Sequence, residues 1–232
     1  MIASFTNNFV WFALTFWAIL ETRSVIVASV IAGIFAVSNM IGAVIIGGYV
    51  DNHRKKTAMV VSSIISLFAF SFGSVIYFVS IFNTKVLVTS PMLWLFVAIL
   101  MIGTVAGNMR LIALSTSVSL LYNEHERDKA NGLVGTVQGI SFSLTSIFSG
   151  IVISFFGMNY ALLIAIFFTL IPLLHIAFLA FPEKLTIENN ENQKKLDIIG
   201  TIAIVSSIPG LLALIFFQSI NNFLGGVFMA LM

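Results

Sequence analysis

The chain has 232 residues, of which 59% are hydrophobic and only 9% are charged. Soluble globular chains carry about 45–50% apolar and about 25% charged residues, so this composition excludes a soluble enzyme and a disordered chain. A formal net charge of +2 gives no basic surface for nucleic acid. Without cysteines, disulfides and thiolate metal sites are excluded, and we expect no metal and no cofactor. The sequence predicts an all-α integral membrane protein that crosses the bilayer several times.

Charged residues divide the chain into apolar segments. A membrane helix needs about 20 apolar residues, so the uncharged 53-residue stretch Ala130–Pro182 predicts two crossings with a turn at Gly157–Asn159. The predicted crossings cover residues 1–20, 25–49, 57–82, 92–121, 131–156, 158–181 and 208–232. We therefore expect a six-helix bundle over 1–181, a polar cytoplasmic linker over 182–207 and a seventh helix over 208–232.

Lysines and arginines predict the orientation in the membrane. The loops after the second, fourth and sixth predicted helices hold eight of them: Arg54, Lys55, Lys56, Arg127, Lys129, Lys184, Lys194 and Lys195. The opposite loops hold only Arg23 and Lys85. The positive-inside rule then places the N-terminus in the cytoplasm of a multi-pass protein, for which we expect the plasma membrane.

A short pattern repeats near the two ends of the sequence. Asn7 and Asn8 sit in a Phe-containing segment that resembles the segment around Asn221 and Asn222, at an offset of 214 residues. Paired carboxamides in an apolar helix each need a hydrogen-bond partner. A true internal repeat is therefore favoured over a chance similarity of the two segments. If the repeat is real, a second copy begins at the seventh helix. The sequence is then interpreted as a fragment, an N-terminal six-helix half plus the first helix of a second half.

The predicted loop after the second helix, from Gly47 to Lys56, reads GGYVDNHRKK. Glycine lets neighbouring helices approach, Asp51 comes at a helix end, and the basic cluster can anchor the loop at an anionic leaflet. This segment resembles the signature G-x-x-x-D-(R/K)-x-G-(R/K)-(R/K) of the major facilitator superfamily. Gly47, Asp51, Lys55 and Lys56 match the signature, whereas Asn52 and Arg54 replace its basic residue and its glycine.

The resemblance implies a 12-helix transporter of two six-helix halves that works by alternating access, as a monomer and without a cofactor. It also implies a cytoplasmic gate at Asp51, Lys55 and Lys56, within a candidate gate motif of Gly47, Asp51, Arg54, Lys55 and Lys56. The alternative for the basic residues is a simple membrane anchor. Of the drug-antiporter signature G-P-x-x-G-G only Gly150 matches, which disfavours a proton-driven drug antiporter. The segment from Glu126 to Leu133 resembles the loop of exporter-type members.

Arg110 is the charged residue that lies deepest inside a predicted crossing, about 27 Å from Met92 and about 16 Å from Leu121 along the helix. Either it lines a central cavity, or it snorkels to the interface or pairs with carbonyls. The superfamily often carries R-x-x-Q-G in this helix, and only the arginine matches here. Candidate cavity or substrate residues are Arg110, Asn7, Asn8, Asn39, Asn108 and Gln138. Candidates for a proton relay are Glu21 and His175, with the proton as candidate coupling ion. Gly103-x-x-x-Gly107 and Gly135-x-x-x-Gly139 predict helix-packing surfaces.

These features favour a secondary transporter that exports small amphiphilic molecules and whose partners are the lipid bilayer and a small-molecule substrate. A lipid flippase or a nutrient permease on the same fold are alternatives. A seven-helix receptor is the alternative of a different class. No H-E-x-x-H motif, intramembrane Asp pair or Ser/His set favours an enzyme.

Overall fold

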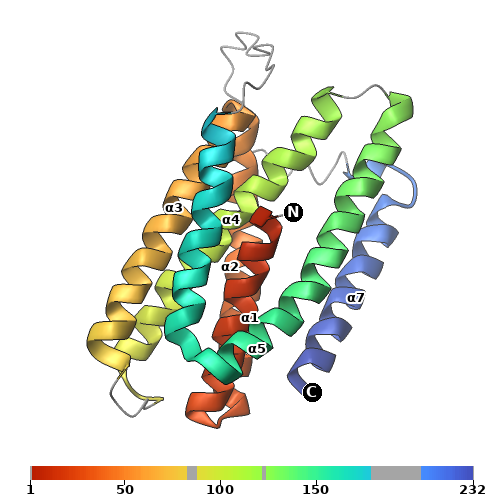
Figure 1. The fold of residues 1–232 in the computed structure, drawn as a ribbon. Coiled ribbons are helices and arrows are strands. Elements are labelled where there is room, and N and C mark those ends of the chain that lie inside the picture. The colour runs from red at the N-terminus through yellow and green to blue at the C-terminus, as the bar shows by residue number, and fades with distance from the viewer. Residues whose placement is uncertain (1, 83–87, 122–123, 179–204, 232) are drawn as a thin grey trace. The chain divides into compact units, whose positions relative to one another are not determined.

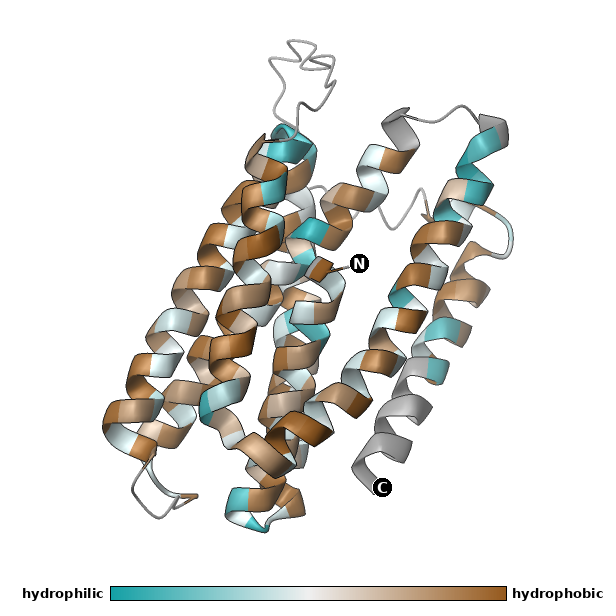
Figure 2. Cartoon of the chain, in the orientation of Figure 1, coloured by the Kyte–Doolittle hydropathy of each residue, from teal (hydrophilic) through white to brown (hydrophobic). Residues whose placement is uncertain are grey.

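The computed structural model describes residues 2–82, 88–121, 124–178 and 205–231 (Figure 1). The chain divides into two compact units, Met1–Leu185 and Thr186–Met232. Every regular element in the described ranges is helical, and hydrophobic residues predominate along the helices, with hydrophilic ones at several helix ends and at a few positions within the helices (Figure 2). The predicted all-α membrane fold is therefore confirmed.

The first unit contains α1 (Ile2–Thr22), α2 (Val25–Asn52), α3 (Lys55–Ile76), the short π-helix η1 (Tyr77–Ile81), α4 (Pro91–Leu121) and α5 (Glu124–Phe178). Among the described residues, four helical stretches are long and apolar enough to cross a membrane. They are Val25–Asn52, Lys55–Ile81, Pro91–Val118 and Glu126–Phe178. The second unit contains α7 (Leu211–Leu231), which begins after Gly210 with its φ of 82°. The predicted linker lies mostly outside the described residues.

The turn between α1 and α2 takes only two residues. Arg23 adopts a left-handed φ of 50°, and its N–H donates to the carbonyl of Ile19 at 2.9 Å, which closes the last turn of α1. Ser24 then caps α2, because its side-chain oxygen accepts from the N–H of Val27 at 3.4 Å. This capping lets α2 run antiparallel to α1 without a polar loop.

The helix α5 is broken at Gly157, where φ is 78° and ψ is −179°. Only glycine occupies this backbone region without strain. The chain reverses direction here, so the segment after Gly157 returns along the bundle (Figure 1). The break falls at the turn that the sequence predicts, inside an uncharged stretch long enough for two crossings.

The centre of the first unit is α1. Its side chains Phe9, Leu14 and Trp17 are buried in the main hydrophobic core with residues of α2, α4 and α5. Two hydroxyls join α1 to α5: Thr6 Oγ1 donates to the carbonyl of Phe168 at 3.1 Å, and Ser149 Oγ to that of Phe9 at 3.4 Å. Thr6 of α1 and Ser149 of α5 are both buried, so these two hydroxyls join the helices inside the bundle.

Small residues bring α3 and α4 together. Ser62 Oγ donates to the carbonyl of Ala106 at 2.6 Å, and Ser66 Oγ to that of Gly103 at 2.8 Å. A Cβ added at Gly103 would lie 2.5 Å from Cε1 of the fully buried Phe70, so only glycine fits. Gly103 therefore packs as predicted. Gly135 and Gly139 make no such contact, since no neighbouring side chain of the described residues comes within 4 Å of an added Cβ, and their packing stays a prediction.

Candidate functional site

Three asparagines form a hydrogen-bonded chain across the first unit. The amide nitrogen of Asn7 on α1 donates to Oδ1 of Asn108 on α4 at 2.7 Å. The amide nitrogen of Asn108 in turn donates to Oδ1 of Asn39 on α2 at 2.5 Å. Oδ1 of Asn7 is buried and has no hydrogen-bond partner among the described residues. These hydrogen bonds link α1, α4 and α2, and they leave Oδ1 of Asn7 as a buried acceptor at the α1 end.

Arg110 lies on α4, two residues beyond Asn108, and is only 3% exposed. Its Nη1 donates to Oγ of Ser63 on α3 at 3.1 Å, and that hydroxyl donates to the carbonyl of Met59 at 2.9 Å. Nε and Nη2 are buried with no hydrogen-bond partner within the described part of the chain. The guanidinium therefore points into the bundle, holds one hydroxyl, and has donors left for a further acceptor.

Gly107 supplies the space between Arg110 and the asparagine chain. A Cβ added at this position would collide with Oδ1 of Asn7 and lie 3.2 Å from Nη2 of Arg110. The unpartnered acceptor and an unpartnered donor thus border the same small space. We name Asn7, Asn39, Asn108, Arg110, Ser63 and Gly107 the polar cluster.

An aromatic pair lies one helical turn from two asparagines of the polar cluster. Trp11 and Phe35 stack with ring centroids 4.0 Å apart and an interplanar angle of 15°. Trp11 comes four residues after Asn7 on α1, and Phe35 four residues before Asn39 on α2, so each shares a helix face with its asparagine. Polar and aromatic groups therefore follow one another along the α1 and α2 faces.

The other predicted site residues lie apart from the polar cluster. Asn8 is half-buried on α1, and Gln138 is half-buried on the first part of α5, next to the exposed Gly139. Glu21 is exposed in the last turn of α1, and His175 is exposed near the end of α5, on the opposite side of the bundle (Figure 1). The structure does not bring these two residues together. Within the described ranges, no three His, Asp or Glu side chains gather as metal ligands do.

In the loop motif, two lysines bind backbone carbonyls at helix ends. Lys55 is buried, and its Nζ donates to the carbonyl of Val50 at 2.5 Å, in the last turn of α2. Lys56 Nζ donates to the carbonyl of Ala177 at 3.0 Å, in the last turn of α5. A cation at a helix C-terminus is favourable because the orphan carbonyls carry partial negative charge. Both lysines therefore tie helix ends to the start of α3.

The remaining motif residues are more accessible. Asp51 and Arg54 are exposed, and Gly47 is half-buried with no side chain of the described residues within 4 Å of an added Cβ. Arg54 has φ of −58° and ψ of 131°, an ordinary conformation for any residue. This backbone explains how an arginine can stand where the signature has glycine. Among the described residues, the structure gives Asp51 no ion pair.

Sequence reasoning missed Ser63, Gly107 and the Trp11–Phe35 pair. A signal for Ser63 was present, because Ser62, Ser63 and Ser66 place small polar groups on neighbouring positions of an apolar helix, where they join helices. Gly107 was predicted to serve helix packing alone, although the nearest atoms to it include the polar Oδ1 of Asn7 and Nη2 of Arg110. Nothing in the sequence indicated the aromatic pair.

Comparison with known proteins identifies the family. No curated protein and no solved structure matches the chain. The family model of the Major Facilitator Superfamily matches residues 1–232. Members of this family are transporters that act on small molecules within a membrane, which agrees with the apolar helices described above. The chain belongs to the Major Facilitator Superfamily, and it is a multi-pass membrane protein of the transporter class.

Proposed function

We propose that this protein is a secondary active transporter that exports small amphiphilic molecules, with the polar cluster as its substrate site. The observation that carries the proposal is Arg110, which is buried inside a membrane-spanning helix with Nε and Nη2 unpartnered among the described residues. An arginine at the centre of a membrane helix costs about 2.5 kcal/mol or more, and such residues mark functional sites by default. A carboxylate, sulfonate or phosphate on the substrate is a natural acceptor for those donors.

The surroundings of Arg110 support an amphiphilic substrate. The guanidinium and the asparagine chain can bind a polar head, while Trp11 and Phe35 offer aromatic surface one helical turn away. A lipid flippase or a nutrient permease on the same fold remain the alternatives. The Trp11–Phe35 pair favours the amphiphile over a fully polar nutrient, since a polar solute gains little from aromatic surface.

For the mechanism we propose alternating access, in which two helical bundles rock about a central site. We assign residues 1–181 to one bundle, 182–207 to a cytoplasmic linker and 208–232 to the first helix of the second. The basic loop residues Arg54, Lys55 and Lys56 support an N-terminus in the cytoplasm. Location in the plasma membrane, action as a monomer, and proton coupling through Glu21 or His175 remain predictions.

The contacts of the loop motif divide the proposed gate into two parts. Lys55 and Lys56 already bind helix-end carbonyls, so we assign them to holding α2 and α5 in place. The exposed Asp51 and Arg54 are then the residues that exchange partners when the gate opens and closes. A single charge suffices for such a role, because two conformations differ by only a few kcal/mol.

The transport experiment uses 8-anilino-1-naphthalenesulfonate, a fluorescent anionic amphiphile, in energised inside-out vesicles that contain the protein. Export predicts accumulation of the dye inside these vesicles. Arg110→Ala should lower the initial rate about tenfold or more, as expected for loss of a charge-assisted hydrogen bond of about 1.5–3 kcal/mol. Arg110→Lys should rescue poorly, since an ammonium cannot reproduce the planar fork.

The matched control is Arg23→Gln, which removes an exposed arginine at the turn after α1 and should leave the rate unchanged. Membrane abundance of each variant is measured by immunoblot. Equal rates for the wild type and Arg110→Ala, at equal abundance, would remove Arg110 from the substrate site. Accumulation of ethidium but not of the anionic dye would contradict the proposed charge of the substrate.

The gate is tested with Asp51→Asn, which removes the charge and keeps the shape. We expect a slower rate of dye accumulation with little change in abundance, because the conformational equilibrium shifts while the fold persists. Asp128→Asn, an exposed aspartate at the start of α5, is the control. Normal transport by Asp51→Asn at normal abundance would rule out the gate role.

A further inference from the structure

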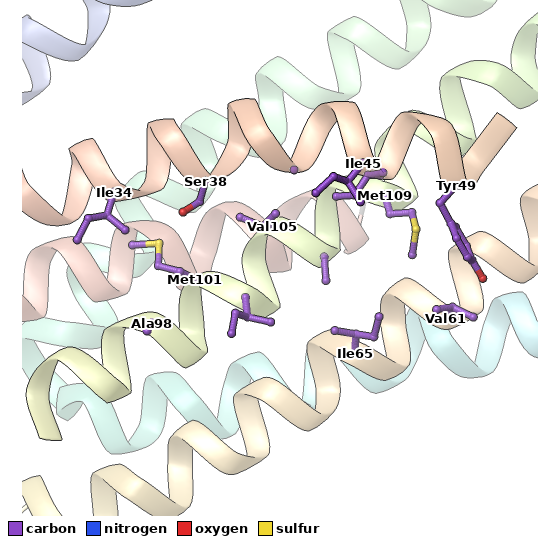
Figure 3. A pocket seen from close by; sticks show the side chains of 14 residues that line it. Ile34, Ser38, Ile45, Tyr49, Val61, Ile65, Ala98, Met101, Val105 and Met109 are labelled. Atoms are coloured by element: carbon purple, nitrogen blue, oxygen red, sulfur yellow. The ribbon is translucent and has the colours of Figure 1, made fainter. Parts of the chain in front are cut away.

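A cavity lies where α2, α3 and α4 meet, and no residue of the polar cluster lines it. Its volume is about 550 Å³, within the range of about 300–1,000 Å³ that is typical of ligand pockets. Residues of α4 form its base, and residues of α2 and α3 form its sides (Figure 3). Arg110 and the three asparagines are not among its lining residues. We name this cavity the α2–α4 groove.

The groove is elongated along α2. Its α2 lining runs from Ile34 to Tyr49 at spacings of three and four residues, a path of about 22 Å at 1.5 Å per residue. At Gly42, α2 lies in close contact with α4, since a Cβ added at Gly42 would lie 2.6 Å from Cγ1 of Val105. A long, narrow shape of this kind suits an extended chain better than a compact molecule.

The lining is almost entirely hydrocarbon. Of its fourteen side chains, only Ser38 and Tyr49 carry a polar group, and the rest are aliphatic or methionine apart from Gly42. Ile45 and Ile102 are more than half exposed. The helices that form the groove are all apolar enough to cross the membrane, so lipid hydrocarbon is the medium next to it. An ionic or strongly polar ligand would lose its hydration here without compensation.

One end of the groove leads to the basic loop. The ring of Tyr49 stacks on the ring of His53 with centroids 4.0 Å apart, and Arg54, the next residue, is exposed. Lys55 and Lys56 follow, so the segment from Asp51 to Lys56 has three basic residues against one acid. Such a charge excess at the end of an apolar groove complements an anionic headgroup joined to a hydrocarbon chain.

We propose that the α2–α4 groove holds one acyl chain of an anionic phospholipid, whose phosphate is bound at Arg54. The site stands apart from the polar cluster, so it does not depend on the substrate proposed above, although it shares Arg54 with the proposed gate. The acyl chain would fill space between α2 and α3 that the side chains of the described residues leave open. Lipid binding then stabilises the position of α2 relative to its neighbours, because a ligand that binds only the folded state raises its stability.

The test uses purified protein in detergent, with palmitoyl-oleoyl phosphatidylglycerol as the anionic probe and the corresponding phosphatidylcholine as the neutral one. Native mass spectrometry should show a retained phosphatidylglycerol, and thermal unfolding should shift upward by several degrees with that lipid and less with phosphatidylcholine. Ala98→Phe fills the groove with an apolar ring at an exposed lining position and should abolish both effects. Ala36→Phe, at an exposed position of α2 outside the lining, should preserve them.

Arg54→Gln tests the headgroup contact and should make the responses to the two lipids equal. Retention of phosphatidylglycerol by Ala98→Phe at the wild-type level would overturn the groove as its site. Equal responses of the wild type to both lipids would overturn the role of Arg54. Displacement of the lipid by 8-anilino-1-naphthalenesulfonate, with Ala98→Phe losing transport, would make the groove an entrance for substrate and would contradict the lipid assignment.

Discussion

The two interfaces of α4 with α3 and with α2 differ sharply, although all three helices are apolar. The α2 segment is more hydrophobic than that of α4, yet only 6% of it is buried, against 50% for α4. At the α3 interface, the hydroxyls of Ser62 and Ser66 bond to α4 carbonyls and Gly103 lies against Phe70. The α2 interface has a hydrogen bond from Asn108 to Asn39 and a close contact at Gly42, but it leaves a groove along the rest of its length. In a bilayer, hydrophobicity does not drive helices together, because lipid is equally apolar. The difference therefore lies in how far close packing and interhelical hydrogen bonds extend along each interface.

Among changes that test this difference between the two interfaces of α4, we expect the largest effect from Gly103→Ala. The new methyl would meet Phe70 and Ala69, both buried, so the α3–α4 interface must open. We expect a loss of about 1–3 kcal/mol in the free energy of unfolding, the usual cost of overpacking, measured by thermal or denaturant unfolding in detergent. Gly33→Ala is the matched control on α2, where no described side chain lies within 4 Å of an added Cβ. Equal losses of stability in Gly103→Ala and Gly33→Ala would contradict the conclusion that α3 packs more closely than α2 against α4.

A smaller effect is expected from Asn108→Ala. This change removes the hydrogen bonds from α4 to Asn7 and to Asn39, and the second of these joins α2 to α4. Interhelical hydrogen bonds in membranes average about 0.6 kcal/mol each, so we expect a loss of about 1 kcal/mol in the free energy of unfolding. Hydrogen exchange should rise in α2 more than in α3. A uniform rise over both helices would show that the asparagine chain does not specifically hold α2.

The smallest effect concerns a single hydroxyl. Ser66→Ala removes one bond from α3 to the carbonyl of Gly103, and we expect a loss of about 0.6 kcal/mol in the free energy of unfolding. Ser219→Ala serves as control, because its hydroxyl donates at 2.8 Å to Ile215 within the same exposed helix. If the control destabilises as much as Ser66→Ala, the interhelical bond adds nothing of its own.

The sequence predicts the course of the backbone well, because charges and glycines mark helix ends directly. The predicted crossings 25–49, 57–82 and 92–121 correspond to Val25–Asn52, Lys55–Ile81 and Pro91–Leu121, and the turn at Gly157 follows from a glycine inside an uncharged stretch. The helix faces are harder to predict. Lipid-facing and core-facing positions are both apolar, so no periodicity says which side of a membrane helix is buried.

The candidate site was also hard to predict, because it depends on which face of each helix is buried. Asn7, Asn39 and Asn108 meet, while Gln138 and Asn8, chosen by the same reasoning, are not part of that chain of hydrogen bonds. Residue type identifies groups that need a partner, but the rotation of each helix decides which of them share one. For Lys55 and Lys56 the sequence identified the charge and not its immediate partner, since carbonyls at helix ends are invisible in a sequence.

The break at Gly157 has a consequence for how the protein enters its membrane. The turn lies far inside the uncharged stretch Ala130–Pro182, so it contains no charge that could orient the two helical segments during membrane insertion. Orientation must then come from the residues on either flank, Glu126 to Lys129 before the pair and Glu183 and Lys184 after it. We therefore expect the two segments to enter the bilayer together, as one helical hairpin, during biosynthesis.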